Sequence, residues 1–173
     1  MEWSAVPGYV IAQMLGGFAG AALVWLFYKD HYDATEDPAT KLGTFCTMPA
    51  IEGHKVRNFF CETIATWLLV LVILVFGLDS NVPTIDAEGY HLHIGMGELG
   101  AIPVTCLIMA IGMSLGGTTG YAINPARDLA LRLAHAILPI KGKGESGWAY
   151  SWVPVAGPMA GAVLAALTYM VLF

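Results

Sequence analysis

Four long apolar stretches, separated by polar segments, dominate the chain. They run from Ala5 to Tyr28, Phe59 to Leu78, Leu99 to Ile123 and Trp148 to Phe173. Three of them contain no charged residue, and the second contains only Glu62. Each provides the roughly 20 apolar residues that a helix needs to cross about 30 Å of hydrocarbon. Because lipid offers no hydrogen bonds to the backbone, the pattern predicts four transmembrane helices.

A fifth apolar segment, Leu129 to Ile140, is too short to span a bilayer. About 12 helical residues extend only about 18 Å, and segments of that length are typically re-entrant or interfacial. Asn124 is a favourable N-cap, and Pro125 suits the first helical position. Glycines at 116, 117 and 120 precede them. We therefore predict irregular backbone that enters the membrane and returns as a half-helix starting at Asn124 to Ala126.

A re-entrant segment keeps both its ends on one side, so the four spans can alternate across the membrane. Segments 29–58 and 118–147 then share one side, and segment 79–98 lies on the other. All eight Lys and Arg residues fall on the first side or in the half-helix. The positive-inside rule would make that side cytoplasmic.

Composition supports this membrane assignment and excludes several functions. Only 12% of the 173 residues are charged, whereas a soluble domain carries about 25%. A net charge of −5 argues against a nucleic-acid partner, which requires a basic patch. Cys46, Cys61 and Cys106 form no C-x-x-C pair and are expected to be apolar or incidental thiols. His91 and His93 have no third ligand at useful spacing, so we expect no metal and no cofactor. No nucleophile–base pair stands out, which argues against an enzyme.

A weak internal repeat relates the first and last apolar stretches. Gly16 to Leu23 reads GGFAGAAL, and Gly157 to Leu164 reads GPMAGAVL. Both contain G-x-x-x-G, a pattern typical of close helix packing in membranes. Repeats are common in transport folds, where broken helices meet near the midplane. Chance similarity in a chain rich in Gly and Ala is the alternative interpretation.

The stretch from Gly112 to Arg132 carries the functional signal. Arg127 lies one turn into the half-helix, and an arginine at membrane depth faces protein or water rather than lipid, unless it snorkels to the interface. At a constriction its five donors would bind solute hydroxyls, and its charge would repel cations and protons. Asn124 can also donate from its amide. Backbone carbonyls of about Gly117 to Ala122 would face the lumen as acceptors. The predicted pore lining therefore includes Thr118, Thr119, Gly120 and Ala122, and the predicted function is a selective pore for small uncharged polar solutes.

The sequence Asn124-Pro125-Ala126-Arg127-Asp128 resembles the second NPA signature of the aquaporin and glycerol-facilitator family, the major intrinsic proteins. The resemblance extends along the chain: Val6 to Tyr28 resembles the third helix of the family, and Gly43-Thr44-Phe45 resembles part of an external loop. It implies an all-α, aquaporin-like right-handed helical bundle. Here that bundle would have four transmembrane helices and one half-helix, where the family has six and two, arranged as inverted repeats.

The subgroup is indicated by Gly112 and Tyr121. Water-selective members carry a histidine and a small residue at these positions, whereas glycerol facilitators pair a small residue with an aromatic one. The resemblance therefore implies that Gly112 and Tyr121 line the constriction with Arg127 and Asn124, and that the absence of a histidine at position 112 widens it. Pro125 and Ala126 of the NPA signature complete the expected pore lining. Asp128 and Arg132 match the facilitator pattern as well. The resemblance therefore implies a passive channel for glycerol and similar small solutes, including water, urea or other polyols. An interfacial tyrosine is the alternative for Tyr121.

Glu62 resembles the buried glutamate of the family's fourth helix. The resemblance implies that its carboxylate accepts hydrogen bonds from backbone N–H groups of the re-entrant loop, with Asp128 as a second structural support. The alternative, from its place near a span end, is a side chain that faces lipid headgroups.

Relative to the family pattern, the first two helices and the first NPA half-helix are missing. We therefore expect residues 1–173 to form one partial transmembrane channel domain, with 57–173 as the second inverted repeat. The resemblance implies a multi-pass plasma-membrane protein, a homotetramer when full-length, that contacts lipid and conducts a small polyol or water. It places the basic side outside, against the positive-inside rule. Two alternative functions are a non-conducting remnant that associates with intact channel subunits, and a water-preferring aquaporin.

Overall fold

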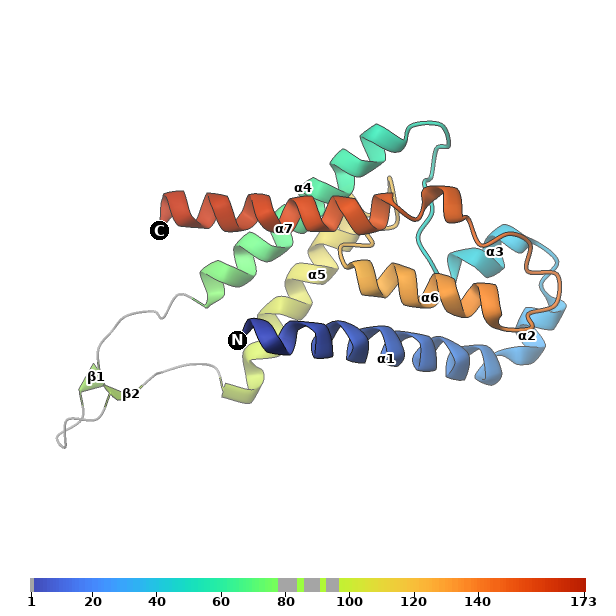
Figure 1. Cartoon of the computed structure of the whole chain (residues 1–173), viewed down its shortest axis with the longest axis horizontal. Coiled ribbons are helices and arrows are strands. Elements are labelled where there is room, and N and C mark those ends of the chain that lie inside the picture. The colour runs from blue at the N-terminus through green and yellow to red at the C-terminus, as the bar shows by residue number, and fades with distance from the viewer. Residues whose placement is uncertain (1, 78–83, 86–90, 93–96) are drawn as a thin grey trace.

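The structure is a computed structural model that describes residues 2–77, 84–85, 91–92 and 97–173 (Figure 1). Its elements are η1 (Trp3–Ala5), α1 (Val6–Phe27), α2 (Lys29–Ala34), α3 (Pro38–Gly43), α4 (Lys55–Phe76), β1 (Thr84–Ile85), β2 (His91–Leu92), η2 (Gly97–Gly100), α5 (Ala101–Leu115), α6 (Pro125–Ile137), η3 (Trp148–Tyr150) and α7 (Val153–Leu172). The two short strands pair antiparallel. Helices make up nearly all the regular structure of the described residues, which confirms the all-α class.

Among the described residues, three helical segments are long and apolar enough to cross a membrane: Trp3–Phe27, Lys55–Phe76 and Trp148–Leu172. The predicted third span is shorter than the sequence indicated, because α5 ends at Leu115 rather than near Ile123. Its 15 residues extend about 22 Å, and η2 directly before it adds about 8 Å. Together they match the roughly 30 Å of a hydrocarbon core.

The predicted half-helix is confirmed as α6. Its N-cap is Asn124, whose Oδ1 accepts hydrogen bonds from the N–H groups of Ala126 (2.9 Å) and Arg127 (3.3 Å). These bonds satisfy donors that the first turn of a helix leaves without partners. At the other end Lys143 Nζ donates to the carbonyls of Ala136 and Leu138, both at 2.7 Å. The helix therefore starts and stops where local polar groups terminate it, and it packs against α1 and α7.

The first turn of α1, the last turn of α4, the first turn of α5 and the last turn of α7 lie toward one end of the molecule, whereas α2 and α3 lie at the other (Figure 1). This is the alternation that the re-entrant segment requires. The Lys and Arg residues accordingly gather at the end that carries α2 and α3, or in α6.

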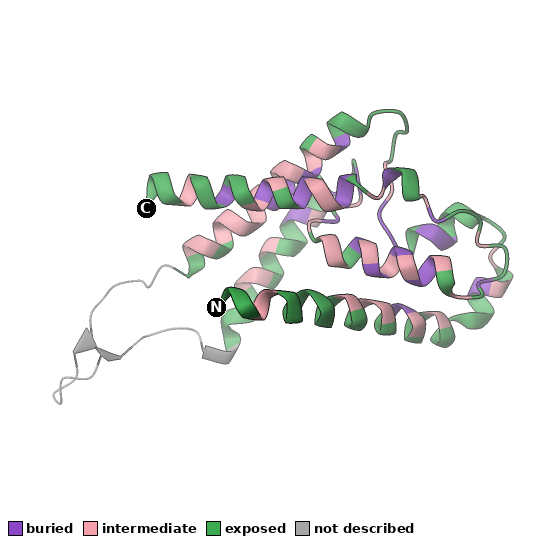
Figure 2. Ribbon diagram, viewed as in Figure 1, coloured by how far each residue is buried: buried purple, intermediate pink, exposed green. Residues whose placement is uncertain are grey.

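Helix packing depends on glycines that admit a neighbouring backbone. A Cβ on Gly161 of α7 would lie 2.4 Å from the Thr63 carbonyl oxygen, and one on Gly157 would lie 2.6 Å from Glu62 Cβ. The G-x-x-x-G of α7 is therefore a packing face against α4. The corresponding Gly16 and Gly20 of α1 have no atom within 4 Å among the described residues. Buried residues concentrate around α6, the near half of α7 and the adjoining loops, whereas α1 is largely exposed (Figure 2).

Candidate functional site

A cavity of about 520 Å³ opens beside the start of α6 and is bordered by residues of α1, α4, α5 and α7. Arg127, Tyr121 and Asn124 line it, as do Ala122 and Pro125. These are five of the ten pore-lining residues that the sequence predicted. The cavity therefore gathers a guanidinium, a phenol ring and a side-chain amide at the tip of the half-helix, which suits a solute with several hydroxyl groups.

The sequence interpretation missed two polar side chains in this cavity, Gln13 of α1 and Thr66 of α4. The Thr66 hydroxyl is buried and finds no hydrogen-bond partner in the described part of the chain. Thr66 lies one helical turn after Glu62, so an i, i+4 polar pair in an apolar span was the available signal.

The backbone that leads into α6 adopts conformations that exclude a right-handed helix. Gly120, Tyr121 and Ile123 have φ values of 77°, 39° and 44°. Left-handed backbone is easy for glycine, costly for other residues and most unusual for a β-branched one. This is the physical reason that the helix does not continue to Ile123. Within the described chain, no donor reaches the carbonyl oxygens of residues 119–123, and three of these residues, Tyr121, Ala122 and Ile123, line the cavity.

The Glu62 carboxylate holds this strained segment. Oε1 accepts from the Ala122 N–H at 2.9 Å and from Thr119 Oγ1 at 2.6 Å, and Oε2 accepts from the Ile123 N–H at 2.9 Å. Glu62 is only 1% exposed. The contact implied by the resemblance is therefore present, and the headgroup-facing alternative is excluded. Hydrogen bonds to a charged acceptor are the stronger kind, which suits a segment that must resist relaxation.

The role expected of Gly112 requires a correction. The sequence placed Gly112 in the wall of the lumen, but the Tyr121 ring covers it. A Cβ on Gly112 would lie 2.9 Å from Tyr121 Cζ, and one on Gly116 would lie 2.5 Å from Tyr121 Cδ1. Gly112 and Gly116 therefore form the surface of α5 on which the Tyr121 ring packs. This packing also argues against an interfacial role for Tyr121.

Four other predicted lining residues lie elsewhere. The Thr119 hydroxyl turns to Glu62, and Gly120 packs against Thr47. Thr118 lines a separate groove with Cys61, and its carbonyl accepts from the Ala50 N–H at 3.0 Å. Ala126 donates its N–H to the Asn124 cap and is absent from the cavity lining. Hydropathy could not separate these positions from residues 121–125, which line the cavity, because it does not record the direction in which an irregular backbone turns each residue.

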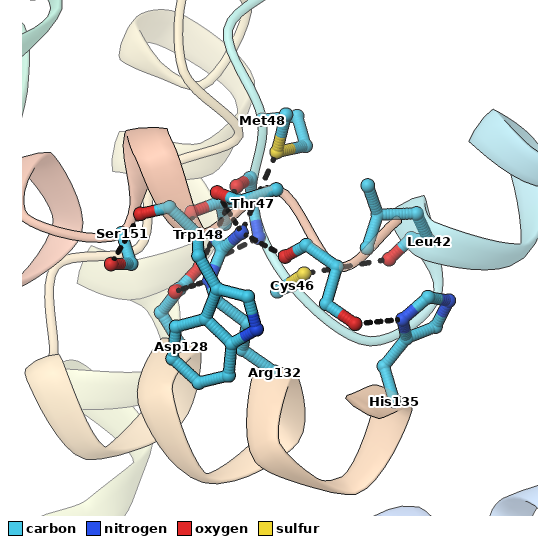
Figure 3. Close-up of polar contacts among 11 residues, drawn as sticks. Leu42, Cys46, Thr47, Met48, Asp128, Arg132, His135, Trp148 and Ser151 are labelled. Atoms are coloured by element: carbon cyan, nitrogen blue, oxygen red, sulfur yellow. Dashed lines mark hydrogen bonds and ion pairs between the residues drawn. The ribbon is translucent and has the colours of Figure 1, made fainter. Parts of the chain in front are cut away.

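Asp128 lies in a buried polar cluster that the sequence identified only in part (Figure 3). It accepts from the N–H and Oγ1 of Thr47, both at 2.7 Å, and from Arg132 Nε at 2.8 Å. Arg132 also donates to the carbonyls of Thr47 (2.9 Å), Ser146 (2.8 Å) and Gly147 (3.0 Å). Asp128 and Arg132 are fully buried. The sequence named Asp128 as a support but missed the partners supplied by Arg132 and Thr47.

Metal-ligating and thiol chemistry find little support in the described residues. Among them, no group of three or more His, Cys, Asp or Glu side chains is arranged to hold a metal ion. The side chains of His91 and His93 lie outside the described part of the chain. Cys46, Cys61 and Cys106 are free thiols, and burial raises the pKa of the Cys46 thiol to about 12.

Apolar spanning helices and a half-helix that ends at a polar cavity together define a membrane protein of the channel type. The family model of the major intrinsic proteins matches residues 1–169, and the chain belongs to this family.

Individual relatives agree with the family match. The chain is 47% identical to the probable glycerol uptake facilitator protein of Thermotoga maritima, over 99% of this chain and 67% of the relative. It is 48% identical to the glycerol uptake facilitator protein of Bacillus subtilis, over 99% of this chain and 57% of the relative. The X-ray structure of the aquaglyceroporin from Plasmodium falciparum superimposes with a TM-score of 0.75 at 30% identity, over 99% of this chain and 66% of that one. The chain thus spans 57% to 67% of the length of these proteins, and the predicted fold is confirmed.

Proposed function

We propose that this chain forms the pore-lining part of a passive channel for glycerol and similar small uncharged solutes. The observation that carries the proposal is the shared cavity of Tyr121 and Arg127. The ring offers an apolar wall to the C–H edge of a polyol, while the guanidinium donates to its hydroxyls. Carbonyl groups of residues 121–123, which line the same cavity and accept no hydrogen bond within the described chain, would supply acceptors. The names of the relatives from Thermotoga maritima and Bacillus subtilis agree with glycerol as the permeant.

The same residues provide a barrier to ions. Arg127 places a full positive charge beside the N-terminus of α6, where the helix dipole adds partial positive charge. Cations and protons are repelled at such a point, whereas a neutral solute is not. Transport in this proposal is passive and involves no covalent chemistry or cofactor. Water, urea and other small polyols are further candidate permeants.

The proposal includes the organisation of the complete channel. Residues 57–173 would be the second of two inverted repeats within a single domain, and α1 would belong to the first. In the weak repeat, Gly16 and Gly20 of α1 correspond to Gly157 and Gly161 of α7. The two α7 glycines pack closely against α4, whereas the two α1 glycines have no atom within 4 Å among the described residues. This correspondence supports an α4-like helix that covers α1 in the assembled channel. We place that channel in the plasma membrane, as a homotetramer surrounded by lipid.

Stopped-flow light scattering of proteoliposomes tests this proposal. Vesicles with the purified chain should re-swell in a glycerol gradient faster than protein-free vesicles. Water flux without glycerol flux would favour the water-preferring alternative. Chains that conduct neither solute alone, but co-purify with an intact glycerol facilitator, would favour the interaction-fragment alternative. Absence of both flux and co-purification would overturn the proposal.

A further inference from the structure

The strained segment 119–123 is held on a second side, opposite Glu62. A Cβ on Gly120 would lie 3.3 Å from Thr47 Cγ2, and the Ala50 N–H donates to the Thr118 carbonyl at 3.0 Å. Gly120 has a φ of 77° and directly precedes Tyr121. The Thr47 methyl group therefore occupies the space beside Gly120, where a side chain would otherwise stand, and Gly120 is the first left-handed residue of the turn that leads into Tyr121.

Thr47 in turn is fixed by the buried pair of Asp128 and Arg132. Its N–H and hydroxyl both donate to Asp128 Oδ2, and its carbonyl accepts from Arg132 Nη2. Thr47 is 5% exposed. Each polar group of this residue is thus engaged by α6, the helix that carries Arg127.

Arg132 joins three segments of the chain through its guanidinium. It makes two hydrogen bonds to Asp128 and one each to Thr47, Ser146 and Gly147. These five bonds to oxygen atoms match the five N–H groups of arginine, and Nη1 also lies 3.6 Å from Met48 Sδ. Lysine presents a single ammonium point and could not reproduce this planar set of contacts. Gly147 leaves room for the arrangement, because a Cβ there would lie 2.9 Å from Arg132 Nη1.

We propose that Arg132 is a positioning residue for the solute filter, acting through Thr47 and Gly120 on the backbone of Tyr121. Arg132 does not line the 520 Å³ cavity, so it makes no contact with solute there. Arg132 keeps the left-handed turn in place, so that the Tyr121 ring stays packed on Gly112 and Gly116 and faces the same cavity as Arg127. Glu62 of α4 and Arg132 of α6 then both stabilise the segment 119–123, Glu62 by direct hydrogen bonds and Arg132 through Thr47. The solute readout below rests on the proposed function, whereas the exchange readout does not.

Hydrogen–deuterium exchange in lipid nanodiscs tests whether Arg132 and Thr47 hold the backbone of residues 119–123 in place. Thr47→Val keeps the shape of the side chain beside Gly120 but removes the hydroxyl donor to Asp128. We expect the Gly120 and Ile123 amides to exchange about tenfold faster than in the wild type, relative to amides of the α4–α7 pair, as the loss of one charge-assisted hydrogen bond predicts. Arg132→Gln should give a larger effect. Wild-type exchange at Gly120 and Ile123, with faster exchange confined to residues 44–50, would overturn the proposal.

Lys143→Met is the matched control. Lys143 also anchors α6 by two hydrogen bonds to carbonyls, but at its C-terminus and without contact to Thr47. The second readout is the ratio of glycerol flux to the flux of a longer linear polyol. This ratio does not depend on the amount of folded protein. It should fall in Thr47→Val and stay at the wild-type value in Lys143→Met. Equal ratios in both variants would also overturn the proposal. Absence of wild-type glycerol flux would instead count against the proposed function, and the exchange result would still decide the role of Arg132.

Discussion

The ring of Tyr121 lies directly on Gly112, so close that a single Cβ at position 112 would approach Tyr121 Cζ to 2.9 Å. A glycine expected to widen a pore instead sets the place of the aromatic wall. Any side chain at 112 must push the ring away from α5 and toward the cavity that it shares with Arg127.

Gly112→Ala should therefore reduce glycerol flux more than water flux. Overpacking at this contact costs about 1–3 kcal/mol, which is relieved when the ring moves into the cavity and narrows it. We expect a glycerol permeability about tenfold lower, with water permeability much less affected, in stopped-flow measurements on proteoliposomes. Gly117→Ala is the control, because that position has no atom within 4 Å. A proportional loss of both fluxes would contradict the size-filter argument.

Substitution of Glu62 should disrupt the strained segment 119–123, partly when the new residue is Gln and completely when it is Leu. Each carboxylate oxygen accepts a backbone N–H, from Ala122 and Ile123. Glu62→Gln would turn its NH₂ group toward one of these donors, so we expect reduced flux and a partial loss of folded protein. Glu62→Leu removes every acceptor, at about 1.5–3 kcal/mol per hydrogen bond, and should abolish flux and folded yield. Detergent-stable protein measured by size exclusion checks the order; a Leu variant as abundant and active as wild type would refute the anchor.

Two glycines with the same backbone conformation test the space around Arg132. Gly142 and Gly147 both have a φ of 62°. A Cβ at Gly142 meets only Lys41 Nζ at 3.5 Å, whereas one at Gly147 would lie 2.9 Å from Arg132 Nη1 and Met48 Sδ. Alanine at either position costs about 1–2 kcal/mol for left-handed backbone. Gly147→Ala should lower the free energy of unfolding by about a further 1–3 kcal/mol, and its thermal unfolding midpoint should therefore be lower than that of Gly142→Ala. Equal midpoints would contradict the claim that the residues around Arg132 are packed too tightly to admit a Cβ.

The sequence predicted the start of the half-helix because its signals are local. Asn124 and Pro125 cap and begin α6 through contacts within three residues. The end of α5 was predicted too late, since hydropathy continues to Ile123 while positive φ values at Tyr121 and Ile123 leave no trace in hydropathy. Arg132 was overlooked as a structural centre because its partner Thr47 lies 85 residues away along the chain. Only a family resemblance connected Glu62 with the loop, 60 residues apart.

The rate of glycerol entry into proteoliposomes, measured over a range of glycerol gradients with and without an imposed ion gradient, decides whether the chain lines a passive pore. A passive pore lined by Tyr121 and Arg127 should give a rate that rises in proportion to the gradient, does not respond to an imposed proton or sodium gradient, and is lost in Glu62→Leu. A rate that depends on an ion gradient, or that equals the rate of protein-free vesicles, would contradict the account.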